Sequence, residues 1–208
     1  MNRRLSRDTT FSLGLAAASM LLMAASCSFG TSGSTGADDV PVPSAHELAT
    51  RAYEAARVWR SDAHLIFIDL EVRPRAGATF SFNSMSHPET GLNVHIDDPL
   101  GTPSLRPVEV DASARKQTLP SIDEYANGPV DSIEAFKIAL ESGGRGYIQG
   151  HPEVWEDPWL WNVNLQYLNV NETPTVVWRV YFTNLLTDGY EVLVDPLTGK
   201  VLEITEGP

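Results

Sequence analysis

The C-terminal stretch from residue 176 to residue 204 constrains the fold of this chain more than any other segment. Between residues 176 and 182, and again between 190 and 194, apolar side chains alternate with other residues, which is the period of a β-strand with one buried side. Turn-forming residues at 187–189 and 195–200 separate the alternating runs. The stretch therefore predicts a meander of antiparallel strands with one apolar face, and that face needs a cover.

The turn at residues 195–200 has the chemistry that closes a hairpin. The carboxylate of Asp195 can cap the turn, Pro196 sets φ, and Gly199 supplies a left-handed backbone position. Asp97 lies in the matching place of an earlier turn. A catalytic pair of these two aspartates is conceivable, but turn capping explains both more simply. Asp97, Asp195 and Gly199 are therefore interpreted as structural turn residues.

The C-terminal region also resembles a known family. A Trp-x-Val-x-Phe strand begins at Trp178, and the sequence Tyr-Glu-Val-Leu-Val-Asp-Pro-Leu-Thr-Gly-Lys-Val-Leu runs from Tyr190 to Leu202. This combination resembles the signature of PepSY domains, and the likeness extends over residues 130–204. PepSY domains are small extracytoplasmic modules found in the propeptides of secreted metallopeptidases and in bacterial envelope proteins. The resemblance implies a non-catalytic α+β module with an inhibitory or chaperoning contact to a peptidase.

The N-terminus has the features of a bacterial secretory signal. Three arginines within the first seven residues precede an apolar stretch at 11–25, which is short for a membrane span. An Ala-Ala-Ser-Cys sequence that ends at Cys27 resembles a lipobox, in which cleavage before the cysteine is followed by attachment of diacylglycerol to its thiol. We therefore expect residues 1–26 to be a signal peptide. The chain is then an exported lipoprotein, anchored on the extracytoplasmic side of a membrane.

The cysteine count supports the lipid anchor. Cys27 is the only cysteine of the chain, so no disulfide and no cysteine metal site can form within one copy. An unpaired cysteine in an exported protein is explained by lipidation, and acyl chains contribute about 0.8 kcal/mol per buried CH₂ group to membrane binding. The alternative is ordinary cleavage near Ala25 or Ser26, which would leave a free soluble domain.

The charge of the chain excludes some partners. Removal of residues 1–26 takes away three arginines and one aspartate, so the net charge changes from −12 to about −14. Binding to nucleic acid needs clustered Lys and Arg, and we expect none. An acidic chain is also not attracted to anionic lipid headgroups, so contact with the membrane is expected through the lipid alone.

Composition and patterning divide the mature chain into four segments. Residues 27–43 form a flexible tether rich in Gly, Ser and Thr, and residues 111–129 form a polar linker. Residues 44–110 and 130–206 each predict a helix followed by strands. The predicted fold class is α+β, with two tandem cystatin-like or PepSY-like units. Each unit would pack a helix on a three- to four-stranded antiparallel sheet, and the first would be degenerate.

The first unit begins with a helix. Ser44 and Glu47 match a capping box. Apolar runs at residues 65–72, 80–82 and 92–96 then predict three strands. The unit lacks the Gly-Lys-Val ending of the second.

A shift of 98 residues aligns the strands of the two halves. The aligned pairs are Leu65 with Val163, Phe80 with Trp178, Val94 with Val192 and Asp97 with Asp195. Such self-similarity indicates a duplicated supersecondary unit. Common strand patterning could also produce part of it by chance, because few residues are identical.

The second unit begins with another apparent capping box, at Asp131 and Glu134. Its helix is predicted to bury one apolar stripe and to stop at Gly143 and Gly144. The expected stripe consists of Ile133, Phe136 and Leu140.

The connection after this helix, at residues 146–159, is unusually long. Connections of this length in compact domains are usually functional or partly structured. It carries the candidate binding residues Trp155, Glu156, Asp157 and Trp159. Together with Trp161, they could bind a basic peptide or form a platform for a sugar. Alternatively, Trp161 begins the core face of a strand while Trp155 and Trp159 cover the edge of the sheet.

The sequence shows no pattern typical of an enzyme or a metal site. His87 and His95 could face each other across a hairpin, but no third ligand lies at metal-like spacing. Neither a Gly-x-Ser-x-Gly motif nor a phosphate-binding glycine loop is present. We therefore expect no catalytic activity, no metal and no cofactor.

The function predicted from the sequence is that of a non-catalytic extracytoplasmic lipoprotein that binds a protein or peptide partner in the envelope. By the PepSY resemblance, the partner would be a peptidase that is regulated or inhibited in trans, since no peptidase domain follows in this sequence. The alternative is an envelope module that binds a small ligand or carbohydrate through the region of Trp155, Trp159 and Trp161.

Overall fold

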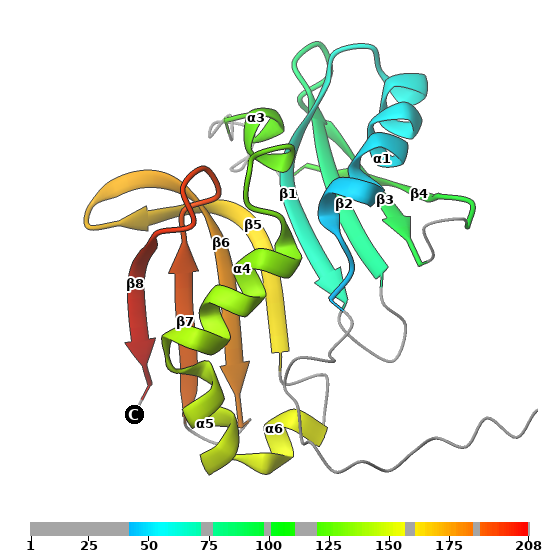
Figure 1. Cartoon of the computed structure of the whole chain (residues 1–208). Helices are drawn as coiled ribbons and strands as arrows, with labels where there is room; N and C mark the ends of the chain where they lie inside the picture. Colours follow the sequence, from blue (N-terminus) through cyan, green and yellow to red (C-terminus); the bar gives the residue numbers. More distant parts are fainter. Residues whose placement is uncertain are drawn as a thin grey trace, which may run out of the picture. The chain divides into compact units, whose positions relative to one another are not determined.

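The strands of the protein form an eight-stranded antiparallel sheet, and helices cross one of its faces (Figure 1). The computed structural model describes residues 42–71, 77–97, 101–110, 120–156, 161–184 and 188–207, with Trp155 and Glu156 described by their backbone alone. The strand order is β4-β3-β2-β1-β5-β6-β7-β8. The fold class is α+β, as predicted. The signal segment 1–26 and Cys27 lie outside the described residues, as does most of the tether.

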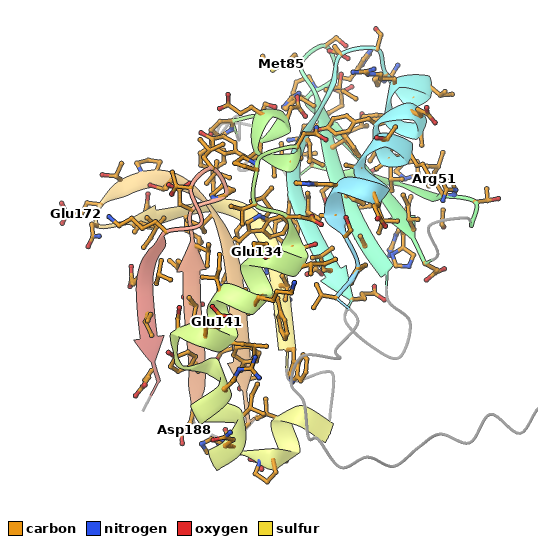
Figure 2. All side chains as sticks on the ribbon, viewed as in Figure 1. Arg51, Met85, Glu134, Glu141, Glu172 and Asp188 are labelled. Atoms are coloured by element: carbon orange, nitrogen blue, oxygen red, sulfur yellow. The ribbon has the colours of Figure 1, made fainter. Side chains whose placement is uncertain are left out.

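The elements follow the chain as a helix and four strands, then a helical segment and four more strands (Figure 1; Figure 2 adds the side chains in the same view). The strands are β1 Ala63–Glu71, β2 Gly77–Ser84, β3 Thr90–Ile96, β4 Ser104–Glu109, β5 Trp161–Val170, β6 Thr173–Thr183, β7 Gly189–Val194 and β8 Val201–Glu206. The helices are α1 Ala45–Trp59, α3 Asp123–Ala126, α4 Ser132–Ala139, the π-type turn η2 Leu140–Gly144, α5 Arg145–Gly150 and α6 Pro152–Glu156.

The two groups of four strands are joined into one sheet through β1 and β5. These strands pair antiparallel at three positions, and the central one places Asp69 opposite Asn164. The prediction of a separate three- to four-stranded sheet in each half is corrected here, because the pairing satisfies backbone groups that two separate sheets would leave open. All described residues belong to one compact unit, which extends over residues 36–208.

Helix α1 forms where the sequence predicts it. Ser44 is its N-cap, with the side-chain oxygen accepting a hydrogen bond from the backbone N–H of Glu47 at 3.1 Å. Leu48, Ala52 and Ala56 lie on the buried face. The small alanine side chains let the helix approach the sheet closely, so a short apolar face is enough to hold it.

The start of α4 differs from the predicted capping box. Asp131 makes no side-chain cap to its own helix. Instead, its Oδ1 accepts a hydrogen bond from the backbone N–H of His46 at 3.2 Å, and Ser132 Oγ accepts one from the N–H of Ala45 at 2.9 Å. Ser132 Oγ also donates to the carbonyl of Pro43 at 2.7 Å. The start of α4 therefore supplies acceptors for backbone N–H groups in the first turn of α1.

Replacement of Ser132 by alanine is expected to lower the free energy of unfolding by about 1–2 kcal/mol, because it leaves the buried N–H of Ala45 without an acceptor. Urea denaturation measures the loss. Ser104→Ala, at an exposed position in β4, is the matched control and should be nearly neutral. Equal stability of the two variants would contradict the shared cap.

The buried face of α4 is also shifted from the predicted stripe. Phe136 and Leu140 are buried as expected, but Ile133 is 38% exposed. Its place toward the core is taken by Ser132, which holds the start of α1. The long-range cap therefore sets the rotation of the helix.

Gly143 does not end the helical segment. The backbone kinks there, with a φ of 122° at Gly143, and continues into α5. The hydroxyl of Tyr190, from β7, donates a hydrogen bond to the carbonyl of Ser142 at the kink. Part of the predicted long loop is thus helical, since α5 and α6 occupy residues 145–150 and 152–156.

One hydrophobic core runs under both groups of strands. Its largest fully buried side chain is Trp178, whose Nε1 donates to the carbonyl of Val130 at 2.9 Å. The other strand residues of this core include Leu65, Ile68, Phe80, Phe82, Leu92, Val94, Val163, Leu165, Val180, Phe182, Tyr190 and Val192. These strand residues alternate along their strands, so their side chains lie on one face of the sheet. Buried residues of α1 and α4 belong to the same core, and both helices therefore cover that face (Figure 1).

The single offset of 98 residues does not hold for all strands. Val94 pairs with Phe80, whereas Val192 pairs with Val180 and not with Trp178. Gly91 pairs with Asn83, which the offset aligns with Tyr181, but Gly189 pairs with Thr183. The β6–β7 pairing is therefore shifted by two residues along β6, and a shift of two keeps the same side chains buried. In β1, a register shift after Leu65 changes the alternation.

The predicted linker at residues 111–129 contains α3. Ile122 and Ala126 are fully buried, and the N–H of Ile122 donates to the carbonyl of Leu65 at 2.8 Å. Residues 111–119 lie outside the described part. The end of the linker is therefore an integral part of the fold.

Candidate functional site

The predicted binding residues fall at the edge of what the structure describes. Trp155 and Glu156 end α6, and the structure gives only their backbone. Asp157 and Trp159 lie outside the described residues, as does the lipidation candidate Cys27. The lipidation of Cys27 and the binding role proposed for residues 155, 156, 157 and 159 remain predictions.

Trp161 belongs to the core. It is 7% exposed, and its ring stacks on Phe136 at a centroid distance of 5.6 Å and meets Phe182 edge-on at 6.0 Å. Its indole N–H donates to the carbonyl of Val154. The packing alternative for Trp161 is confirmed, and a ligand platform that includes this side chain is wrong.

The predicted turn aspartates lie far apart in the sheet. Asp195 Oδ1 accepts from the N–H groups of Leu197 at 2.8 Å and Thr198 at 3.3 Å, and Gly199 has a φ of 71°. Asp97 is 56% exposed and contacts His95 Nε2 at 2.7 Å. Four strands lie between β3 and β7, so the two aspartates do not form a catalytic pair.

The face of the sheet opposite α1 and α4, here called the open face, carries a row of polar side chains that sequence reasoning did not single out. Each member lies directly opposite the next on a neighbouring strand. From β4 to β6 the row consists of Ser104, His95, Thr79, Asp69, Asn164 and Arg179. Five steps between strands at about 4.8 Å each give the row a length of roughly 24 Å.

Side-chain amides along β5 order the middle of this row. Gln166 Nε2 donates to Asn164 Oδ1 at 2.6 Å, and Asn164 Nδ2 donates to Asn162 Oδ1. Asn162 Nδ2 then donates to Asp69 Oδ1 at 3.2 Å. All three bonds run toward the carboxylate, so the orientations of the amides are fixed relative to one another. We call these four residues the amide ladder.

An ion pair and a histidine flank the amide ladder. On the β6 side, Arg179 forms an ion pair with Glu191, and its guanidinium lies 5.1 Å from the centre of the Tyr181 ring. On the β3 side, His95 Nδ1 lies 2.9 Å from Thr79 Oγ1. The open face therefore carries hydrogen-bonding groups that the protein already holds in place, with Asn164 itself only 4% exposed.

Burial raises the pKa of the Asp69 carboxyl above its ordinary value. The hydrogen bond from Asn162 lowers the pKa and the charge of Glu71 raises it, but burial is the largest cause. The folded chain therefore binds this proton more tightly than the unfolded chain does. The carboxylate is unfavourable for stability at pH values above the folded-state pKa, and this penalty disappears as the pH falls below the unfolded value of about 3.9.

Replacement of Asp69 by asparagine is expected to raise Tm slightly at pH 7, because it removes a partly buried charge and keeps an oxygen for Asn162. The difference from wild type should shrink as the pH is lowered toward about 3, where Asp69 is protonated. Thermal melts between these pH values test this. Glu109→Gln, on exposed β4, should show no comparable trend, and a stabilisation by Asp69→Asn that grows on acidification would contradict the expectation.

A second polar feature is a cavity of about 370 Å³ beside α1 and α3, which is lined by Thr50, Tyr53, Glu54, Arg57, Ala63, Asp123 and Asn127. The Tyr53 hydroxyl donates to Asp123 Oδ1 at 2.6 Å, and the backbone N–H of Leu65 donates to the same oxygen at 2.8 Å. Burial, followed by the hydrogen bond and charge of Asp123, raises the pKa of Tyr53 well above its usual range.

No candidate metal site is present among the described residues. No three or more His, Cys, Asp and Glu residues among them are grouped so that they could hold a metal ion. His87 contacts Glu89, whereas His95 contacts Asp97 and Thr79. The two histidines therefore have separate partners.

Comparison with known proteins supports the fold and leaves the family open. No family model matches the chain, and no curated protein matches it. A crystal structure of a "putative lipoprotein" from Clostridium difficile 630 has a similar fold, with a TM-score of 0.50 and 17% sequence identity. The match covers 76% of this chain and 91% of that chain. Among the helices of the described ranges, none has the length and apolar character needed to cross a bilayer.

Proposed function

We propose that this chain is an exported, lipid-anchored protein without catalytic activity, which binds a protein partner through the open face of its sheet. The observation that carries the proposal is the amide ladder, whose hydrogen bonds hold it in place before any partner binds. Ordered interface groups lower the entropic cost of association, so an ordered polar face favours binding.

The dimensions of the open face suit a macromolecule better than a small ligand. A row of roughly 24 Å spans a large part of a standard interface, which buries about 800 Å² on each partner. The row contains both donors and acceptors, which suit the polar groups of a polypeptide. The carbohydrate alternative loses Trp161 from its platform, so the protein-binding function is preferred.

The PepSY resemblance suggests the finer description of two tandem PepSY-like units and a partner that is a peptidase, regulated or inhibited in trans. The order of elements supports it, since each half contains helix before four consecutive antiparallel strands. The proposal of a peptidase partner rests on analogy with the PepSY family, so the partner has to be identified by experiment.

Lipid anchoring is tested at Cys27. We expect the wild-type chain to sediment with membranes and Cys27→Ser to move largely into the non-membrane fraction, because two or more acyl chains anchor stably and none remain in the variant. The matched control is Ser28→Ala, which leaves the thiol in place. Equal membrane association of wild type and Cys27→Ser would contradict the anchor, and the mass of the N-terminal peptide would identify the cleavage site.

The partner surface is tested by site-specific photo-crosslinking in the native envelope. A photoreactive residue replaces Ser81 or Gln166 on the open face, and Val58, which is 87% exposed on α1, is the control position. We expect a discrete protein adduct from the open-face positions and none from the control. Adducts from Val58 alone, or from no position, would contradict the proposed surface.

A further inference from the structure

The cavity between α1, the start of β1 and α3 lies outside the open face and has its own chemistry. Its volume is about 370 Å³, near the lower end of the range for small-molecule sites. Ala63 is the only apolar side chain among the residues that line it, apart from the ring of Tyr53. A ligand of this cavity is therefore small and polar.

One wall of the cavity is rigid. Asp123 is held from two elements, because the hydroxyl of Tyr53 in α1 and the backbone N–H of Leu65 in β1 both donate to its Oδ1. Tyr53 is itself fixed by an edge-on contact with the ring of Phe82, at a centroid distance of 5.3 Å. Both bonds use Oδ1, so within the described residues Oδ2 is left to accept from a ligand.

The cavity also carries opposite charges on neighbouring turns of α1. Glu54 and Arg57 are three residues apart and both exposed, yet no ion pair between them is formed in the described part of the structure. Arg57 is close enough for its charge to act on the hydroxyl of Tyr53. One basic residue, Arg57, and two acidic residues, Glu54 and Asp123, therefore line one small cavity.

We infer that this cavity binds a small zwitterion of the size of a free amino acid, with its ammonium group between the carboxylates of Glu54 and Asp123 and its carboxylate on Arg57. A simple anion would meet two carboxylates, and a simple cation would meet the guanidinium, so neither matches the charges as well. Thr50 and Asn127 add neutral hydrogen-bonding groups at the same cavity. This site is independent of the proposed protein partner.

The test is calorimetric titration of the purified chain with each of the twenty amino acids, followed by the amine and the acid derived from the tightest binder. We expect at least one amino acid to bind with a Kd below about 1 mM. Its decarboxylated amine and its deaminated acid should each bind about tenfold more weakly, as expected for one lost charge-assisted contact. Binding of no amino acid, or equal binding of either analogue, would overturn the inference.

Two variants locate the site. Arg57→Gln and Glu54→Gln, both at exposed positions of α1, should each weaken binding about tenfold without lowering Tm. Glu47→Gln, exposed at the start of the same helix, is the matched control and should bind as wild type. Unchanged affinity in Arg57→Gln would overturn the assignment even if an amino acid binds elsewhere.

Discussion

Replacement of Gly143 by alanine is expected to lower the free energy of unfolding by about 2–5 kcal/mol. The φ of Gly143 is 122°, outside the regions that residues with a Cβ adopt without strain. The added Cβ would also overlap the hydroxyl of Tyr190, which bonds to Ser142 at the kink. Backbone strain of about 1–2 kcal/mol and overpacking of about 1–3 kcal/mol together give this range. Urea denaturation at neutral pH measures the loss.

Gly146→Ala is the matched control, because Gly146 lies in α5 and nothing stands within 4 Å of the position its Cβ would occupy. It should be neutral or stabilising, since alanine is the better helix former. Tyr190→Phe removes the overlapping hydroxyl, so the penalty of Gly143→Ala should be smaller in that background. An equal effect of the two alanine substitutions would show that the kink does not restrict residue 143.

Replacement of Trp178 by alanine is expected to lower the free energy of unfolding by about 3–5 kcal/mol. The side chain is fully buried, and its removal leaves a cavity and deprives the carbonyl of Val130 of its indole donor. Most domains have a total stability of about 5–15 kcal/mol, so the variant should be close to unfolding at 37 °C. Denaturation followed by circular dichroism gives the value.

Val58→Ala is the control for truncation of an apolar residue, because Val58 is 87% exposed. It should change stability by less than about 0.5 kcal/mol. Trp178→Phe should retain part of the packing but still lose the bond to Val130. A loss below about 1 kcal/mol for Trp178→Ala would contradict its central place in the core.

Local patterns predicted the local elements well. The period of two predicted β6 and β7, in which the alternating residues Trp178, Val180 and Val192 are fully buried. Ser44 predicted the start of α1. These features depend on residues close together in the sequence, so local sequence patterns are sufficient to predict them.

Contacts between distant residues explain the wrong predictions. Asp131 and Ser132 accept hydrogen bonds from backbone N–H groups of α1, which lies more than eighty residues earlier. This contact turns α4 so that Ile133 faces solvent. Gly143 marks a kink instead of an end because Tyr190 stabilises the backbone there. The pairing of β1 with β5 likewise has no signal within either strand.

The open face was missed because its residues look like the ordinary solvent side of alternating strands. One signal was available, since Asn162, Asn164 and Gln166 place three amides on the same side of one strand. The hydrogen bond from Asn162 to Asp69, which joins these amides to a carboxylate, depends on the pairing of β1 with β5. The candidate binding residues predicted from the sequence were instead placed around Trp155 and Trp159, next to Trp161, which is buried.

The pairing of β1 with β5 also affects whether either half of the chain can remain soluble without the other. Either half alone would expose one of these strands along its length, with Ile68 or Leu165 beside unpaired backbone groups. Such an edge is a template for pairing with another chain. A protease cut in the 111–129 region that separated the halves would therefore release fragments prone to aggregate, whereas the intact chain presents only β4 and β8 as outer strands within the described sheet.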